Sequence, residues 1–184
     1  MANLILISGD LAAGKSTLAA SLSEALNLVY LTKDSLKEIA CDAIGYETRE
    51  ENRQLSIAAT DSMIYFFNQC AKVGQSLILE ANFRQDEISR IKEIADEYSY
   101  QVLLINLTGD INLLDQRVLD RRVYRHVAHR SLHLDYSIDR FAVYINDIRN
   151  QDLLYPAFNI DMTYLDEEEV TEEALKIVHQ ELGI

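Results

Sequence analysis

Apolar runs bounded by polar residues recur along the chain and alternate with longer segments of helical periodicity. Short apolar runs predict buried strands, whereas apolar residues that repeat every three to four positions predict amphipathic helices. We expect strands at residues 4–8, 28–32, 76–80, 102–108 and 158–165. We expect helices at residues 15–26, 34–44, 48–73, 86–98, 110–129, 137–151 and 169–182.

Strands that alternate with helices are typical of an α/β fold in which a parallel sheet lies between two layers of helices. The chain has 184 residues, so we expect a single domain over residues 1–184. One proline, six glycines and no low-complexity segment leave nothing that resembles a linker. Ligands of such folds bind at the carboxyl ends of the strands, so functional residues are expected directly after each predicted strand.

Residues 9–17 read Gly-Asp-Leu-Ala-Ala-Gly-Lys-Ser-Thr and follow the first predicted strand. This is a complete G-x-x-x-x-G-K-[ST] phosphate-binding loop in its strand–loop–helix setting, which an ordinary glycine turn would not need. The glycines avoid Cβ atoms that would obstruct the turn or the phosphate, the lysine reaches the β- and γ-phosphates, and the serine hydroxyl ligates Mg²⁺. The sequence therefore predicts a nucleoside triphosphate site formed by Gly9, Asp10, Leu11, Ala12, Ala13, Gly14, Lys15, Ser16 and Thr17.

A carboxylate, Asp34, lies at the start of the helix that follows the second predicted strand. It could be the N-cap of that helix, because aspartate accepts hydrogen bonds from the unpaired N–H groups there. In a phosphate-loop kinase the same position faces the acceptor, where a carboxylate can orient and deprotonate a hydroxyl. Asp34 is therefore our candidate for the catalytic base and for acceptor binding, with Lys33 and Lys37 as candidate phosphate or substrate contacts.

Glu80 ends the otherwise apolar third strand, where an isolated buried carboxylate would be costly. Mg²⁺, bound directly or through water, would compensate for this cost, so Glu80 joins Ser16 as a candidate metal ligand. A structural salt bridge to an arginine of a lid or helix is the alternative. Asn82 and Arg84 follow Glu80 and are candidate substrate contacts.

Arginines gather between positions 117 and 130, after the fourth predicted strand of an otherwise acidic chain. Arg117, Arg121 and Arg125 are four residues apart and are expected to share one helix face, where like charges repel unless an anion lies among them. A transferring phosphoryl group supplies such an anion, which makes Arg121 and Arg125, in a lid at about residues 117–136, candidate catalytic residues together with Lys15. An exposed helix paired with acidic neighbours is the alternative.

Three histidines, His126, His129 and His133, follow at spacings of three and four and could line one face of the same helix. Zinc binding is conceivable, but no cysteine lies nearby, and the metal expected of a nucleotide enzyme is magnesium. We therefore favour contacts with the lid or the substrate, and the sequence does not assign a functional role to any of the three.

The net charge of -13 disfavours a nucleic-acid partner, because affinity for a polyphosphate backbone comes mainly from lysine and arginine. Cys41 and Cys70 lie far apart in helical segments and are expected to be reduced thiols. The apolar run near the N-terminus is too short for a signal peptide, and no segment is long enough to cross a membrane. We expect a cytoplasmic protein of undetermined oligomeric state.

Residues 9–17, 32–38, 80–84 and 117–125 together resemble the small P-loop kinases of the nucleoside-monophosphate-kinase-like group. They look most like the AAA-type branch of zeta toxins, chloramphenicol phosphotransferase and polynucleotide 5′-kinases. Residues 80–84 are similar to the Asp-Gly-x-Pro-Arg stretch of adenylate kinases but depart from it at three of four fixed positions. The resemblance implies a P-loop three-layer sandwich with a five-stranded parallel sheet in the order 2-3-1-4-5 and a helical lid after strand 4.

The same resemblance implies ATP and Mg²⁺ as cofactors, with Arg117 on the adenine and a later lid arginine on the phosphates. The leading hypothesis is a kinase that transfers the γ-phosphoryl group of ATP to a hydroxyl of an unidentified small molecule. Asp34 favours this over a nucleoside-monophosphate kinase, because a carboxylate repels an ionised acceptor phosphate whereas a hydroxyl needs a base. The alternatives are a regulatory ATPase that signals to a protein partner and a toxin-type kinase with an inhibitory partner.

Overall fold

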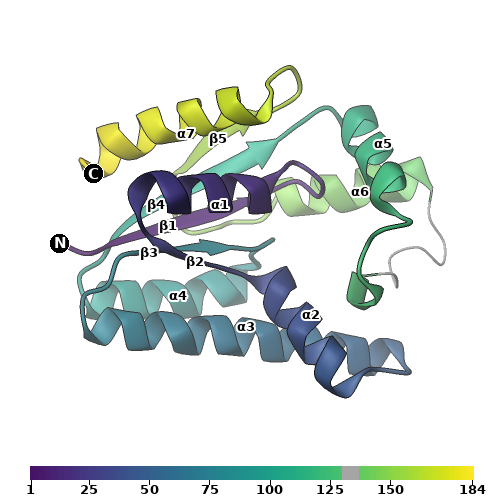
Figure 1. The fold of residues 1–184 in the computed structure, drawn as a ribbon, viewed down its shortest axis with the longest axis horizontal. Coiled ribbons are helices and arrows are strands. Elements are labelled where there is room, and N and C mark those ends of the chain that lie inside the picture. Colours follow the sequence, from purple (N-terminus) through teal and green to yellow (C-terminus); the bar gives the residue numbers. More distant parts are fainter. Residues whose placement is uncertain (130–136) are drawn as a thin grey trace.

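The computed structural model describes residues 1–129 and 137–184 and contains one five-stranded sheet (Figure 1). All strand pairs are parallel, and the order is β2-β3-β1-β4-β5. This order confirms the fold class expected from the sequence. The strands are β1 (Asn3–Gly9), β2 (Val29–Thr32), β3 (Leu77–Glu80), β4 (Gln101–Thr108) and β5 (Ala157–Asp161).

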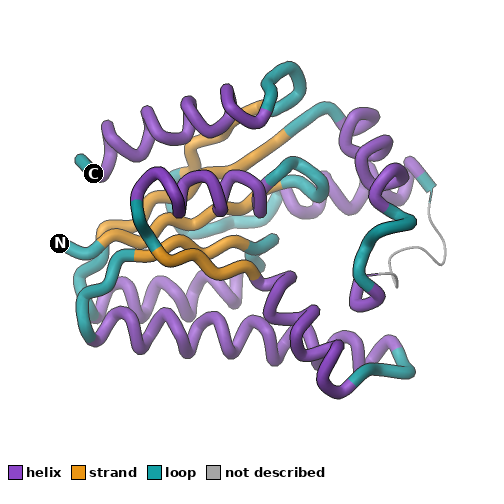
Figure 2. Tube along the Cα trace, in the orientation of Figure 1, coloured by secondary structure: helices purple, strands orange, loops and turns teal. Residues whose placement is uncertain are grey.

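Helices cover both faces of the sheet, α1 and α7 on one and α3 and α4 on the other (Figures 1 and 2). The chain termini lie at the end of the sheet opposite to α2 and α5 (Figure 1). The helices are α1 (Lys15–Leu26), α2 (Lys33–Ile44), α3 (Arg49–Lys72), α4 (Gln85–Glu97), α5 (Ile111–Arg121), α6 (Ile138–Arg149) and α7 (Glu167–Leu182).

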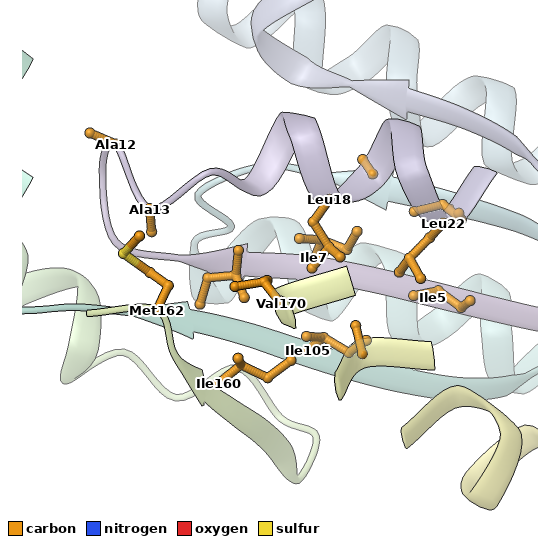
Figure 3. Close-up of a cluster of buried hydrophobic side chains, with 14 of the residues drawn as sticks. Ile5, Ile7, Ala12, Ala13, Leu18, Leu22, Ile105, Ile160, Met162 and Val170 are labelled. Carbon is orange, nitrogen blue, oxygen red and sulfur yellow. The ribbon is translucent and has the colours of Figure 1, made fainter. Parts of the chain in front are cut away.

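The central strand β1 is buried on both faces, because its alternate side chains point to opposite sides of the sheet. Ile5 and Ile7 join the cluster formed with α1 and α7 (Figure 3). Leu4 and Leu6 join the cluster formed with α3 and α4. All four side chains are fully buried, and each contributes about 1.5–3 kcal/mol relative to an exposed position. These contacts fix the strand that leads into the phosphate loop.

The helix after β4 is shorter than predicted. The sequence predicts it over residues 110–129, whereas α5 ends at Arg121. Residues 127–129 instead form a short 3₁₀ turn that packs against α2 and α3. There the Tyr46 hydroxyl donates to the Val127 carbonyl at 2.7 Å, and the Asn52 amide donates to the Ala128 carbonyl at 2.9 Å. The expectation that Arg125 shares a helix face with the other two arginines is therefore wrong.

The last strand is also shorter than predicted, since β5 ends at Asp161 and not at residue 165. Directly after the strand, the Asp161 carboxylate accepts from the Thr163 amide at 3.0 Å and forms a local turn. Within the described part of the chain no helix is long and apolar enough to cross a membrane. Cys41 and Cys70 are both buried free thiols.

Candidate active site

The backbone of the phosphate loop adopts conformations at two positions that require glycine. Gly9 has a φ of +122°, and a Cβ there would lie 2.0 Å from the carbonyl oxygen of Leu107 on β4. Gly14 has a φ of +90° at the N-cap of α1, a conformation that side chains disfavour. No side chain caps α1, so the first N–H groups of the helix are open to an anion.

Lys15 is buried inside the loop, and its ammonium group is hydrogen-bonded to backbone carbonyl groups in place of water. Its Nζ donates to the Asp10 carbonyl at 2.6 Å and to the Gly9 carbonyl at 3.2 Å. Burial lowers the pKa of Lys15, while the nearby Glu80 carboxylate is the largest influence in the opposite direction. The amine is thus held where phosphate oxygens would compete with the two carbonyls for it.

The Asp10 side chain is fully buried and points into the protein, where it pairs with Arg149 at the end of α6. Arg149 Nη2 lies 2.5 Å from Asp10 Oδ2, and the Gly109 amide donates to the same oxygen at 3.1 Å. The pairing raises the pKa of Arg149. Asp10, predicted as an ATP-binding residue, therefore contributes to the site through its backbone and through the shape of the loop.

Ser16 and Glu80 lie side by side, as expected of a pair that holds one ion. The Ser16 hydroxyl donates to Glu80 Oε2 at 3.0 Å. Burial raises the pKa of Glu80, and the Lys15 charge opposes this shift. Among residues 1–129 and 137–184 no ion pair involves Glu80, so the alternative of a structural salt bridge is not found there.

The chemistry of these two groups fits Mg²⁺, which prefers hard oxygen ligands. Mg²⁺ is commonly bound by one or two carboxylates together with water and substrate phosphates. A hydroxyl and a carboxylate at the mouth of a phosphate loop match this donor set. The described residues hold no group of three His, Cys, Asp or Glu side chains that could form an all-protein metal site.

The start of α2 decides between the capping role and the catalytic role considered for Asp34. The N-cap is Thr32, whose side chain accepts from the Ser35 amide at 3.1 Å. Asp34 lies in the first turn of the helix with a side chain that is 57% exposed, so its carboxylate is not needed as the cap. Its neighbours are engaged elsewhere, since Lys33 pairs with Glu87 and Lys37 donates to the side-chain oxygen Oδ1 of Asn52 at 2.8 Å.

A cavity of about 910 Å³ runs from the phosphate loop to α2, α3 and α4. It brings together residues from separate segments of the chain, including both candidate metal ligands, Ser16 and Glu80. It is also lined by most of the residues predicted as catalytic or substrate-binding: Lys15, Lys33, Asp34, Asn82, Arg84, Arg121 and Arg125. Lys37, the other candidate phosphate or substrate contact, does not line it. Gly9 and Asp10 line neither this cavity nor the smaller one beside it.

The smaller cavity, of about 410 Å³, lies on the other side of the loop between α1 and the start of α7. Its lining includes Ala13, Thr17 and Val170, and Arg117 borders it with Nη1 3.4 Å from the Met162 sulfur. A flat, largely apolar base would fit between such groups. Arg121 lines both cavities, so it stands where a base and a phosphate chain would join.

The segment after α5 reaches back across the large cavity to α2. Arg125 Nη2 lies 3.7 Å from Asp34 Oδ2. His126 Nε2 lies 3.0 Å from Asp42 Oδ1. His129 Nε2 lies 3.0 Å from Glu38 Oε1 and 3.9 Å from Asp34 Oδ2. The predicted lid continues over residues 130–136 with His133, which lie outside the described residues.

The family model named zeta toxin matches residues 2–168. The chain belongs to the zeta toxin family. A search of curated proteins gives no match. Among solved structures, a protein of Chloroflexus aurantiacus provisionally described as a kinase is similar at 26% identity and a TM-score of 0.79, covering 95% of this chain and 97% of that one.

More distant structures share the fold of this zeta toxin family member. Shikimate kinase from Acinetobacter baumannii, in complex with shikimate, has 15% identity and a TM-score of 0.65, with 98% of this chain and 94% of that one covered. The tunicamycin resistance protein of Deinococcus radiodurans has 16% identity and a TM-score of 0.62, with 97% and 96% covered. Family and fold together support a small-molecule kinase of the P-loop type.

Two residues of the site are not marked by any sequence motif. Arg149 lies 139 positions from Asp10, and the motif allows any residue at position 10, so nothing in the sequence points to their pairing. Tyr144 lines the large cavity from α6, which was predicted only as a helix. The one signal in the sequence is Asp10 itself, because a carboxylate at a variable position of a phosphate-binding loop would repel the ligand unless a cation pairs with it.

Proposed function

We propose that this protein transfers the γ-phosphoryl group of ATP to a hydroxyl of a small polar acceptor, with Mg²⁺ held by Ser16 and Glu80. One observation carries the proposal. Asp34, whose carboxylate does not cap its helix, and Lys15, at the phosphate loop, line one continuous cavity. A general base for a hydroxyl and a cation for the transferred group therefore share one space.

The expected reaction forms a bond between the acceptor oxygen and the γ-phosphorus and breaks the bond from that phosphorus to the ADP oxygen. Asp34 accepts the hydroxyl proton of the acceptor. Lys15, Arg121 and Arg125 stabilise the charge on the transferring group. When bound, Mg²⁺ would supply further neutralisation of phosphate charge at Ser16 and Glu80.

The lining of the large cavity beyond Asp34 supports a polar acceptor. It includes Thr60, Asp61, Glu87 and Arg90, and the aliphatic Ile57 is the one apolar side chain that α3 contributes among the described lining residues. Hydrogen-bonding side chains of both signs suit a molecule with several hydroxyl or carboxyl groups, which could join the pairs that Thr60 and Lys33 form with Glu87 and that Arg90 forms with Asp61. Shikimate and gluconate, acted on by kinases of the same fold, are molecules of this kind.

The experiment measures transfer of labelled phosphate from [γ-³²P]ATP to a panel of sugars, sugar acids and hydroxy acids, with free phosphate counted in parallel. Asp34→Asn should keep ATP binding and lose about 100- to 10,000-fold in transfer, because an amide cannot accept the proton. Asp139→Asn is the matched control, since Asp139 is an exposed carboxylate in the first turn of α6 and lines neither cavity.

A regulatory ATPase would give a different result. It would release free phosphate at the same rate with and without the panel, and Asp34→Asn would leave that rate unchanged. The family also brings the alternative of a toxin-type kinase with a protein partner, which uses the same transfer chemistry. Transfer to a panel compound that depends on Asp34 supports the proposal, and acceptor-independent hydrolysis that is insensitive to Asp34 contradicts it.

A further inference from the structure

A buried amide on α3 connects α2 with the residues that follow α5. Asn52 is only 5% exposed, and its Oδ1 accepts from the Lys37 side chain of α2 at 2.8 Å. Its Nδ2 donates to the Ala128 carbonyl at 2.9 Å, in the stretch after α5 that we call the return segment (residues 122–129). These two partners need both a donor and an acceptor between them, which an amide supplies. Aspartate has the same shape but offers acceptors alone, and leucine offers neither.

The return segment carries two side chains that lie next to Asp34, the proposed catalytic base. Arg125 Nη2 is 3.7 Å and His129 Nε2 is 3.9 Å from the same carboxylate oxygen, Oδ2. Ala128, which bonds to Asn52, directly precedes His129 and follows Arg125 by three residues. A shift of the Ala128 carbonyl would therefore move both side chains relative to Asp34. Arg125 is also proposed to meet the transferring group, so its placement affects two partners of the reaction.

The other bonds of the return segment to neighbouring elements lie closer to solvent. Val127, whose carbonyl accepts from Tyr46, is 44% exposed. The Asp42 side chain that pairs with His126 is 73% exposed. The Asn52 bond is buried, so water does not compete for it as it does for an exposed contact. We therefore expect the Asn52 bond to contribute most to the position of the segment.

We propose that Asn52 is a positioning residue for phosphoryl transfer. Its amide holds the return segment in the place that brings Arg125 and His129 next to Asp34. The inference rests on the proposed function for the roles of Asp34 and Arg125. It goes beyond that function by assigning a part in turnover to a residue that lines neither cavity. The effect is expected to be large, because a misplacement of about 1 Å at a reacting group can cost about 100-fold in rate.

The test exchanges the amide for a carboxylate. Asn52→Asp keeps the shape and the acceptor for Lys37, but it places an oxygen where the donor to the Ala128 carbonyl was. Asn106→Asp is the matched control, because the Asn106 amide also donates one side-chain bond, to Asn159 Oδ1 at 2.8 Å, and lines neither cavity.

Two quantities are measured on each variant. The first is kcat and KM for transfer from ATP to the best compound of the acceptor panel. The second is the affinity for ADP with aluminium fluoride, a mimic of the transferring phosphoryl group, compared with the affinity for ADP alone. The melting temperature shows that each variant is folded under the assay conditions. Tyr46→Phe is a milder second variant, since it removes a bond of the same segment without adding a charge.

Asn52→Asp should lower kcat and the affinity for the fluoride mimic by about ten- to 100-fold, while the affinity for ADP changes by less than about twofold. Tyr46→Phe should act in the same direction by about threefold, the range of one neutral hydrogen bond. When Arg125→Ala is already present, Asn52→Asp should have little further effect, because residues that act through one contact are not additive. A merely structural role would lower ADP affinity and turnover together, and its effect would add to that of Arg125→Ala.

The inference is overturned by full additivity, by an equal loss of ADP affinity, or by a loss in Asn106→Asp as large as that in Asn52→Asp. If Asn52→Asp does not fold, Tyr46→Phe decides by the same criteria. Binding of the fluoride mimic that depends on Asn52, without transfer to any panel compound, supports the inference and contradicts the small-molecule kinase. Transfer that depends on Asp34 but is indifferent to Asn52→Asp supports the kinase and overturns the inference. A wild-type protein that neither binds the mimic nor transfers phosphate overturns both proposals.

Discussion

The phosphate loop and the end of the large cavity where we propose that the acceptor binds (the acceptor end) are assembled in different ways. The loop draws its functional atoms from consecutive residues, and its shape is fixed by buried contacts to β4 and α6. The acceptor end draws on α2, α6, the segment after β3 and the turn after α5. That turn is held to α2 by the bond of His129 to Glu38 and to the loop between α2 and α3 by the bond of Tyr46 to Val127.

The difference separates what must be rigid from what must adapt. A loop that binds a constant triphosphate gains from buried anchors, because preorganised N–H groups lose nothing when the ligand arrives. An acceptor end made of side chains from several elements can change its specificity through single substitutions without disturbing the loop. Three predictions test this contrast, beginning with the anchor of the loop.

The largest expected effect is on stability. Arg149→Ala removes a cation whose side chain is 33% exposed and leaves the fully buried Asp10 carboxylate uncompensated, which costs about 3–5 kcal/mol. The free energy of unfolding from guanidinium denaturation measures this loss. Arg53→Ala is the comparison, because Arg53 pairs with Glu50 at 2.8 Å while both side chains are more than 60% exposed, and such pairs contribute about 1 kcal/mol or less. Similar losses for the two variants would contradict the anchoring role.

The sequence identifies almost all residues that shape the phosphate loop, but only some of those at the acceptor end. The loop is local: Gly9, Lys15 and Ser16 sit in a fixed motif, so their placement follows once the preceding strand is recognised. The partner of the buried Asp10, Arg149, cannot be identified from the sequence, because the two residues lie 139 positions apart. The predicted helix over residues 110–129 failed because tertiary bonds from Tyr46 and Asn52 to residues 127 and 128 outweigh local helical periodicity.

The next effect is on chemistry at the loop. Lys15→Ala removes the cation that would meet the transferring phosphoryl group, and the loss of such a contact costs on the order of 3 kcal/mol, at least a hundredfold in turnover. The fold should survive, since among residues 1–129 and 137–184 Lys15 bonds only to carbonyl groups of its own loop. Single-turnover transfer at saturating ATP and magnesium measures the effect, with the melting temperature as control. Turnover near the wild-type value would rule out a catalytic role for this loop.

The smallest expected effect is a pH dependence of the free energy of unfolding that arises at the acceptor end. His129 is buried between the α2 groups Asp34, Lys37 and Glu38 and Arg125 of the following turn. Burial has the largest influence on the pKa of His129 and lowers it. The positive charges of Arg125 and Lys37 lower it further, whereas the carboxylates of Asp34 and Glu38 oppose this shift. An unfolded histidine has a pKa of about 6.5, so below this pH the unfolded state binds more protons than the folded state.

The contribution of His129 to stability should therefore be complete above pH 6.5 and should fall as the pH drops toward the lowered pKa. The slope cannot exceed about 1.4 kcal/mol per pH unit, the limit for one proton. Unfolding free energies of wild type and His129→Gln, measured from pH 8 down to pH 5, should converge or cross as the pH falls. A wild-type and His129→Gln difference that is independent of pH would mean that this histidine does not tune the stability of the acceptor end.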